Sequence, residues 1–147
     1  MSITNTIFQI TFPDGWKETT VYTFEGPHDS GVQHNLVLVV DPFIKKDIEL
    51  KDYAQAQIAG PKQVMPGFEM VSEKDKTMPD GNVAYEIVYK YIPAEGMILF
   101  QKQIYMRKEG KAFIFTATFS KKTLATKGNI IDLIIGSFCL FKSTDAE

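Results

Sequence analysis

The sequence predicts an α+β domain: an antiparallel sheet of six to seven strands, with two main helices packed on one face. Short apolar or alternating segments are separated by turns rich in Gly, Pro, Asp and Asn, which is typical of antiparallel strands. Only residues 50–65 and 124–137 change to a helical period. Because 147 residues suffice for one sizeable core and hardly for two, we expect a single domain over residues 1–147.

Seven strands are predicted from runs of β-branched and aromatic residues that end at turns. They lie at residues 6–11, 19–24, 35–40, 68–75, 83–91, 97–108 and 112–119. Pro13-Asp14-Gly15 ends the first strand, because Pro13 presets φ and Gly15 tolerates a positive φ. Residues 26–31 are interpreted as a loop, and the apolar run at 35–40 predicts a strand buried on both sides. Short turns join the last four strands, which predicts a meander.

Two amphipathic helices complete the expected fold. In residues 50–65, apolar side chains recur at i, i+4, i+7 and i+11. The interior Gly60-Pro61 predicts a kink or a helix in two parts, because an interior proline costs about 3 kcal/mol or more. In residues 124–137 the spacing i, i+3, i+4 and i+7 starts at Ile131, and we expect Gly128 to delay the helix start.

Composition excludes several classes of function. The net charge of −2 gives no basic footprint, so we expect neither nucleic-acid binding nor attachment to an anionic membrane. The single Cys139 excludes an internal disulfide, and its apolar surroundings predict a buried thiol. No segment approaches about 18 continuous apolar residues, so stable membrane insertion is not expected. If Met1 is the true start, the missing leader predicts a cytoplasmic protein.

Side chains with catalytic or metal-binding chemistry are scattered. His28 and His34 are six positions apart without acidic partners at ligand spacing, so we interpret them as solvated rather than as a metal site. Glu86 is the main carboxylate inside a predicted strand, and no second one stands at a spacing that suggests acid/base catalysis. We therefore expect no catalytic, metal-binding or cofactor-binding residues, and no enzyme.

The predicted sheet carries more apolar surface than its helices can cover. Strands 83–91, 97–108 and 112–119 have apolar side chains on both faces. Two helices of roughly 15 residues, each about 22 Å long, would cover one face and leave the other. The surplus face predicts a homo-oligomer interface, a groove for an apolar ligand, or both. The alternative is that the aromatic side chains reach the core around the helices and leave only scattered apolar residues outside.

The central part of residues 97–108 is unexpectedly polar. Strand alternation puts Gln101 and Gln103 on one face with Met97, Leu99 and Tyr105. A glutamine donates and accepts hydrogen bonds without the desolvation cost of a charge, so these amides suit a surface that receives an uncharged partner. The alternative is that they are ordinary glutamines on a solvated face.

Four motifs in this order resemble the DcrB-like family with its PsbP-type α/β fold. They are Phe12-Pro13-Asp14-Gly15-Trp16, Met65-Pro66-Gly67-Phe68, Phe100-Gln101-Lys102-Gln103-Ile104-Tyr105 and Ser137-Phe138. The resemblance covers about residues 7–141. Without a leader, the chain is similar to the cytoplasmic branch of Eag-type chaperones of bacterial type VI secretion. That resemblance implies a non-catalytic homodimer that binds the apolar transmembrane-segment helices of secreted effectors, keeps them soluble and helps load them onto the secretion spike.

The resemblance points most directly to Gln57 and Gln103 as partner-binding residues, and strand alternation adds Gln101. The full set that we expect to contact a partner is Gln57, Tyr85, Ile87, Tyr89, Met97, Leu99, Gln101, Gln103 and Tyr105. Two other functions stay open. The chain could be a DcrB-like protein that binds a small molecule or lipid, or an enzyme, through a pocket between sheet and helices. It could also be a structural homodimer whose apolar face is consumed by self-association.

Overall fold

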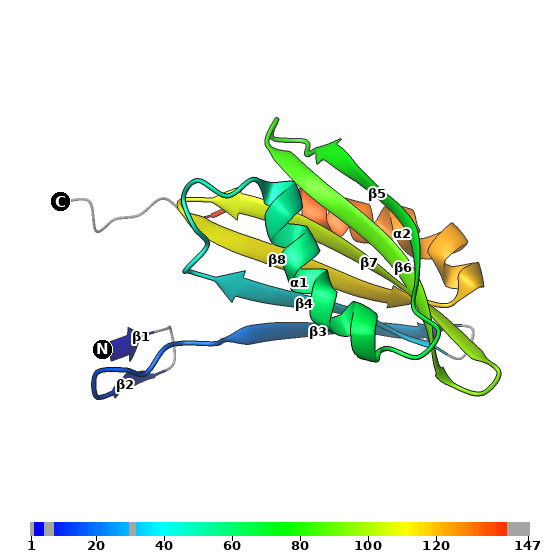
Figure 1. Ribbon diagram of the computed structural model, residues 1–147, viewed down its shortest axis with the longest axis horizontal. Helices are drawn as coiled ribbons and strands as arrows, with labels where there is room; N and C mark the ends of the chain where they lie inside the picture. Colours follow the sequence, from blue (N-terminus) through cyan, green and yellow to red (C-terminus); the bar gives the residue numbers. More distant parts are fainter. Residues whose placement is uncertain (1, 5–7, 30–31, 141–147) are drawn as a thin grey trace.

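The computed structural model describes residues 2–4, 8–29 and 32–140 and confirms an α+β fold with a six-stranded antiparallel sheet (Figure 1). The sheet has the strand order β3-β4-β8-β7-β6-β5, and β1 and β2 pair separately. The elements are β1 (Ser2–Thr4), β2 (Gln9–Thr11), β3 (Val21–Asp29), β4 (Val32–Asp41), α1 (Leu50–Val64), β5 (Glu69–Thr77), β6 (Val83–Ala94), β7 (Met97–Lys108), β8 (Lys111–Phe119) and α2 (Lys121–Gly136). The predicted meander is therefore β5 to β8.

The two helices lie on opposite faces of the sheet, so the prediction that both pack on one face is wrong. Helix α1 contacts β6 and β7, and in Figure 1 it lies in front of the sheet, whereas α2, which contacts β7 and β8, lies behind it. The reason is strand alternation, because odd-numbered and even-numbered side chains of β6 point to opposite faces of the sheet. Ile87 is buried in the core beneath α1, and Ala84 is buried in the core beneath α2. Each apolar face of the central strands is buried by its own helix.

Two hydrophobic cores therefore flank the sheet. The core under α1 holds Ile44, Tyr53, Ala54, Ile58, Tyr85, Ile87, Tyr89, Tyr105, Ala112 and Ile114. The core under α2 holds Leu36, Leu38, Met78, Ala84, Ile104, Met106, Phe113, Phe115, Ala117, Phe119, Ile131 and Ile135. A helix about 22 Å long covers only part of a sheet face, so each face also has partly open regions.

Both helices differ from expectation at one glycine or proline. Helix α1 runs without interruption through Pro61, whose carbonyl accepts from the Met65 N–H at 2.9 Å. Pro61 lies in the last turns, and the carbonyl that its missing N–H would have bonded belongs to the exposed Gln57, where water can replace it. Helix α2 starts at Lys121, before Gly128, because Ser120 and Thr123 form a capping box.

Among the described residues, neither helix has the length and apolar character that a membrane span requires.

Two further predictions fail locally, and a third is confirmed in part. Residues 26–29 of the predicted loop extend β3, which accommodates them with a β-bulge between Glu25 and His28; residues 30–31 lie outside the described residues. Cys139 is exposed rather than buried, because its neighbours Phe138 and Leu140 pack against the core instead. Of the predicted strand at 6–11, Gln9–Thr11 is β2, and residues 6–7 lie outside the described residues.

Four charged side chains form a partly buried group between the sheet and α2. Lys102 lies 2.8 Å from Asp132 of α2 and 3.9 Å from Glu86, and Lys76 lies 3.0 Å from Glu86 and 3.2 Å from Asp132. Burial lowers the pKa of Lys76, but its hydrogen bonds with Glu86 and Asp132 and their charges outweigh this and leave the pKa raised. The group joins β5, β6 and β7 to α2, which explains why Glu86 stands inside a strand.

Candidate functional site

A strip of uncharged, partly exposed side chains lies on the α1 face of the sheet, beside the helix. We call it the amide strip, and its members are Gln57 of α1, Val37 and Val39 of β4, Gln101 and Gln103 of β7, and Thr116 and Thr118 of β8. The strand register places these side chains on one face, because Gln103 is opposite Thr116 and Thr116 is opposite Val37. The strip thus crosses three neighbouring strands without a charge.

Hydrogen bonds hold both strip glutamines in place. The Tyr105 hydroxyl donates to Gln103 Oε1 at 2.6 Å, and Gln103 Nε2 donates to Thr116 Oγ1 at 3.3 Å. The Tyr89 hydroxyl likewise donates to Gln101 Oε1, and Gln101 Nε2 donates to Thr118 Oγ1 at 3.1 Å. Each amide therefore joins a tyrosine beneath α1 to a threonine of the strip. This accounts for two glutamines in the middle of a strand.

The tyrosines in this arrangement stay protonated at neutral pH and so remain donors. Burial, and to a smaller extent Tyr91, raise the pKa of Tyr89 to about 12. Burial, followed by the neighbouring Tyr89, also raises the pKa of the Tyr105 phenol. The orientation of the two amides is thus fixed over the whole physiological pH range.

Gln57 joins the strip from the edge of α1. It lines a hollow of about 280 Å³ together with Tyr53, Val39 and Ile114, and the hollow also contacts Asp41. The Tyr53 hydroxyl donates to Asp41 Oδ2 at 2.7 Å. Burial raises the Tyr53 pKa, and the hydrogen bond and negative charge of Asp41 raise it further. The amide of Gln57 therefore forms the α1 end of the strip, next to a fixed phenol.

Only part of the predicted partner-binding set is open to a partner. Gln101 and Gln103 lie opposite the strip threonines, and Gln57 reaches the strip at Val39, with which it lines one hollow. The four side chains Tyr85, Ile87, Tyr89 and Tyr105 are each at most 4% exposed beneath α1, so they are core residues that support the strip instead of contacting a partner. Met97 and Leu99 share the face but lie at the β6–β7 turn, away from the strip centre.

Sequence reasoning missed the contributions of β4 and β8 to this surface. Val37 and Val39 were expected to be buried on both sides, but only the alternate Leu36 and Leu38 are buried, under α2. Thr116 and Thr118 alternate with buried residues of β8 and could have been assigned to an open face. Their meeting with Gln103 and Gln101 depends on strand pairing, which alternation alone does not specify.

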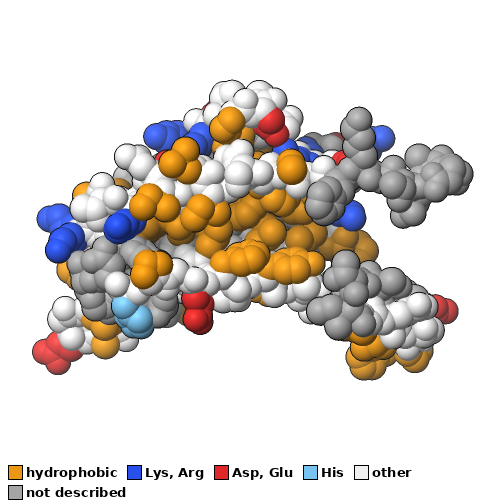
Figure 2. Space-filling view, turned by 180° about the vertical axis from the view of Figure 1, so that it is seen from behind, with side chains coloured by type: hydrophobic (Ala, Val, Ile, Leu, Met, Phe, Trp, Pro, Cys, Tyr) orange, Lys and Arg blue, Asp and Glu red, His pale blue; other side chains and the backbone are white. Residues whose placement is uncertain are grey.

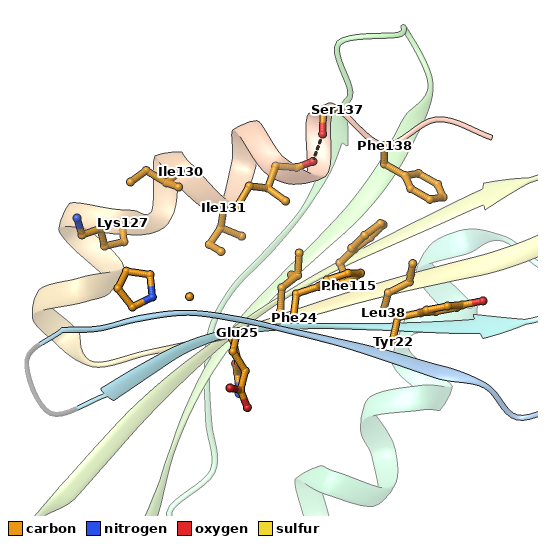
Figure 3. A pocket seen from close by; sticks show the side chains of 15 residues that line it. Tyr22, Phe24, Glu25, Leu38, Phe115, Lys127, Ile130, Ile131, Ser137 and Phe138 are labelled. Carbon is orange, nitrogen blue, oxygen red and sulfur yellow. Dashed lines mark hydrogen bonds between the residues drawn. The ribbon is translucent and has the colours of Figure 1, made fainter. Parts of the chain in front are cut away.

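The opposite face of the sheet carries a larger and more apolar hollow, which we call the α2 groove. Its volume is about 570 Å³, and it runs between α2 and strands β3, β4 and β8 (Figure 3). Its apolar walls consist of Tyr22, Phe24, Leu36, Leu38, Phe115, Ile130, Ile131, Ile134 and Phe138. Figure 2 shows this face with hydrophobic side chains gathered along a hollow. None of these residues was in the predicted set.

Metal-binding chemistry is not visible in the described part of the chain. No group of three or more His, Cys, Asp or Glu side chains there could hold a metal ion. His28 is exposed in β3, and the side chain of His34 lies outside the described residues.

Comparison with known proteins connects this geometry to a family. Residues 8–137 match the model of the DcrB family. No curated protein matches the chain. The chain is similar in structure to PA94 from Pseudomonas aeruginosa, a putative regulator of unknown function, with a TM-score of 0.74 and 18% identity over 97% of this chain and 98% of that one.

Two further solved structures match the chain. Cyanobacterial PsbP (CyanoP) from Synechocystis sp. PCC 6803 has a TM-score of 0.58 and 16% identity over 96% of this chain and 92% of that one. LpqN, involved in cell envelope biogenesis of Mycobacterium tuberculosis, has a TM-score of 0.47 and 19% identity over 74% and 64% of the two chains. The likeness to CyanoP shows that the fold is PsbP-like.

Proposed function

Because the chain belongs to the DcrB family, we propose that it is a cytoplasmic, homodimeric chaperone for apolar, transmembrane-type helices of secreted effector proteins. In this proposal it acts without catalysis: it keeps such helices soluble and presents them for loading by a type VI secretion apparatus. The amide strip is the proposed contact surface. The proposed cytoplasmic location of the protein and its proposed link to type VI secretion rest on the sequence resemblance to Eag-type chaperones.

The width and chemistry of the amide strip carry the proposal. Neighbouring strands are about 4.8 Å apart, so the three strands of the strip together with the adjoining β3 span about 14 Å. An α-helix with its side chains is about 10–12 Å across, so one helix fits along this surface beside α1. The strip offers it β-branched side chains, hydroxyls and amides, and no charge.

A transmembrane helix needs this combination when it is outside a membrane. It satisfies its own backbone hydrogen bonds, but its Gly, Ser and Thr positions pack closely against neighbouring helices and exchange side-chain hydrogen bonds with them. Gln101 and Gln103 are held by Tyr89 and Tyr105, so they reach a ligand already oriented. The strip thereby supports binding by imitating a neighbouring helix.

The apolar side chains of the edge strand β3 support the proposed dimer. Strand β3 lies at an edge of the described sheet, and its Val21 and Phe24 are more than half exposed on opposite faces. The other edge strand, β5, instead carries the charges of residues 73–76, which discourage edge-to-edge association. We propose that a second copy of the chain covers the β3 side and, together with the amide strip, encloses the bound helix. Light scattering of the purified protein should give twice the chain mass.

A capture assay with a matched pair of variants tests the helix-binding role. The probe is a synthetic leucine-rich helix of about 20 residues with Gly and Ser on one face, long enough to span a bilayer. Purified protein should keep this peptide in the supernatant after ultracentrifugation. Gln57→Glu, in the strip, should weaken capture at least about five-fold by placing a charge against an apolar ligand. Gln63→Glu, exposed on the same helix, is the control.

Three outcomes separate the candidate functions. Capture that is weakened by Gln57→Glu and not by Gln63→Glu supports the chaperone role. A stable dimer that fails to retain the peptide would indicate self-association alone. A monomer that co-purifies with a small apolar molecule would favour the second candidate, a ligand-binding protein, for which the α2 groove is the relevant observation.

A further inference from the structure

We propose that the α2 groove is a binding site for a fatty acid, with the acyl chain along the groove and the carboxylate at Lys127. The site lies on the face of the sheet opposite the amide strip, so the inference goes beyond the proposed chaperone role. It rests on the shape of the groove, its apolar walls and the position of its single cationic side chain.

The groove has walls suited to a flexible apolar chain. Helix α2 supplies Ile130, Ile131 and Ile134 along one side, and Phe24 of β3 faces them across a floor that includes Phe115 (Figure 3). Ile131 and Phe115 are buried, whereas Phe24 is 55% exposed and Ile134 47% exposed. The rim therefore has apolar surface that an inserted chain would remove from water.

The charges differ between the two ends of the groove. Figure 3 shows Lys127 at one end, and Tyr22 and Phe138 at the other. Among the described residues Lys127 forms no ion pair. Glu25 also lines the Lys127 end, but its carboxylate points away from the groove (Figure 3). A ligand with one negative group at one end of an apolar chain matches this arrangement.

A narrow acyl chain suits this groove better than a helix. An α-helix with its side chains is about 10–12 Å across, whereas an acyl chain carries no side chains. A helix would consequently rest on the rim and leave the floor unfilled. The groove's volume of about 570 Å³ lies within the range of about 300–1,000 Å³ that is usual for small-molecule sites. A single acyl chain can reach the floor between Ile131 and Phe115.

Fluorescence of cis-parinaric acid, with displacement by saturated fatty acids, tests the site in the intact 147-residue chain. Affinity should rise about four-fold for each added methylene until the groove is filled, and then level off. A fatty acid should bind about two- to five-fold more tightly than the alcohol of equal length, as expected for a partly exposed ion pair. Lys127→Gln should abolish that preference, and Lys122→Gln, an exposed lysine of the same helix, should keep it.

A second pair of variants tests the position of the chain. Ile134→Arg places a charge on the rim and should weaken binding at least ten-fold. Leu133→Arg is the control, because Leu133 is 75% exposed on α2 and does not line the groove. Far-UV circular dichroism should show that both variants keep their helices. Neither variant alters the amide strip, so peptide capture should be unchanged in both.

Several results would overturn the inference. Equal affinity for the acid and the alcohol in the wild-type protein would remove the role of Lys127. Unchanged binding in Ile134→Arg would place the fatty acid elsewhere. A dimer that dissociates in Ile134→Arg, together with no displacement of the probe by fatty acids, would assign the groove to a second copy of the chain. If the wild-type protein binds fatty acids but does not capture the peptide, the chaperone role alone would be contradicted.

Discussion

Removal of the Tyr105 hydroxyl tests how the amide strip is built. Tyr105→Phe deletes the donor that lies 2.6 Å from Gln103 Oε1 and leaves the aromatic ring in the core under α1. A net hydrogen bond contributes about 0.5–1.5 kcal/mol, and Gln103 is half-buried, so water can only partly replace the lost donor. We expect the free energy of unfolding to fall by about 1 kcal/mol, and the melting temperature by about 2–4 °C.

Urea denaturation followed by far-UV circular dichroism measures this change, and Tyr22→Phe provides the control. The Tyr22 side chain is exposed on β3, so the loss of its hydroxyl should change stability by less than about 0.5 kcal/mol. The denaturant slope should be the same in both variants, because the surface exposed on unfolding is unchanged. Equal stability of Tyr105→Phe and Tyr22→Phe would refute the conclusion that buried tyrosines hold the strip glutamines.

Three other predictions follow from the structure. The pKa of Tyr89 is raised to about 12, so as pH rises the unfolded chain releases this proton before the folded protein does. The free energy of unfolding should therefore fall by up to about 3 kcal/mol between pH 10 and 12, and by less in Tyr89→Phe, as measured by urea titration at each pH. Gly67 has φ +67° and a Cβ there would come within 2.9 Å of Ile92, so Gly67→Ala should lower the free energy of unfolding by about 1–3 kcal/mol in the same assay; an unchanged midpoint would contradict this. Glu86→Gln leaves Lys102 and Lys76 to share one carboxylate and should destabilise by about 3 kcal/mol, and full stability in thermal unfolding would show that the charged group contributes little.

Local patterns predicted the elements well where two signals agreed. The strand at 97–108 coincides with β7 because a Gly-containing turn bounds it on each side. Helix α2 was predicted three residues late, because the capping box at Ser120 outweighs the weak helix propensity of Gly128. The β3 extension through Gly26-Pro27 was missed, because a β-bulge at an edge strand tolerates residues that usually mark a loop.

The sequence could not specify how the layers are arranged. Apolar residues on both faces of β6 and β7 were recognised, but they fit either one covered face or two, and only packing shows that α1 and α2 take opposite faces. The same limit applies to the site. The family resemblance pointed to Gln103, and alternation placed Gln101 on the same face, whereas the neighbours Thr116 and Val37 follow from the pairing of β8 with β7 and β4.

Site-specific photo-crosslinking tests the central claim that the amide strip binds an apolar helix. The photoreactive residue p-benzoylphenylalanine replaces Thr118 in the strip, and in a control variant it replaces Val71, which is 49% exposed on the far edge strand β5. With the synthetic helix as ligand, the account predicts a crosslinked product from position 118 and none above background from position 71. Equal crosslinking from both positions, or crosslinking from position 71 alone, would contradict it.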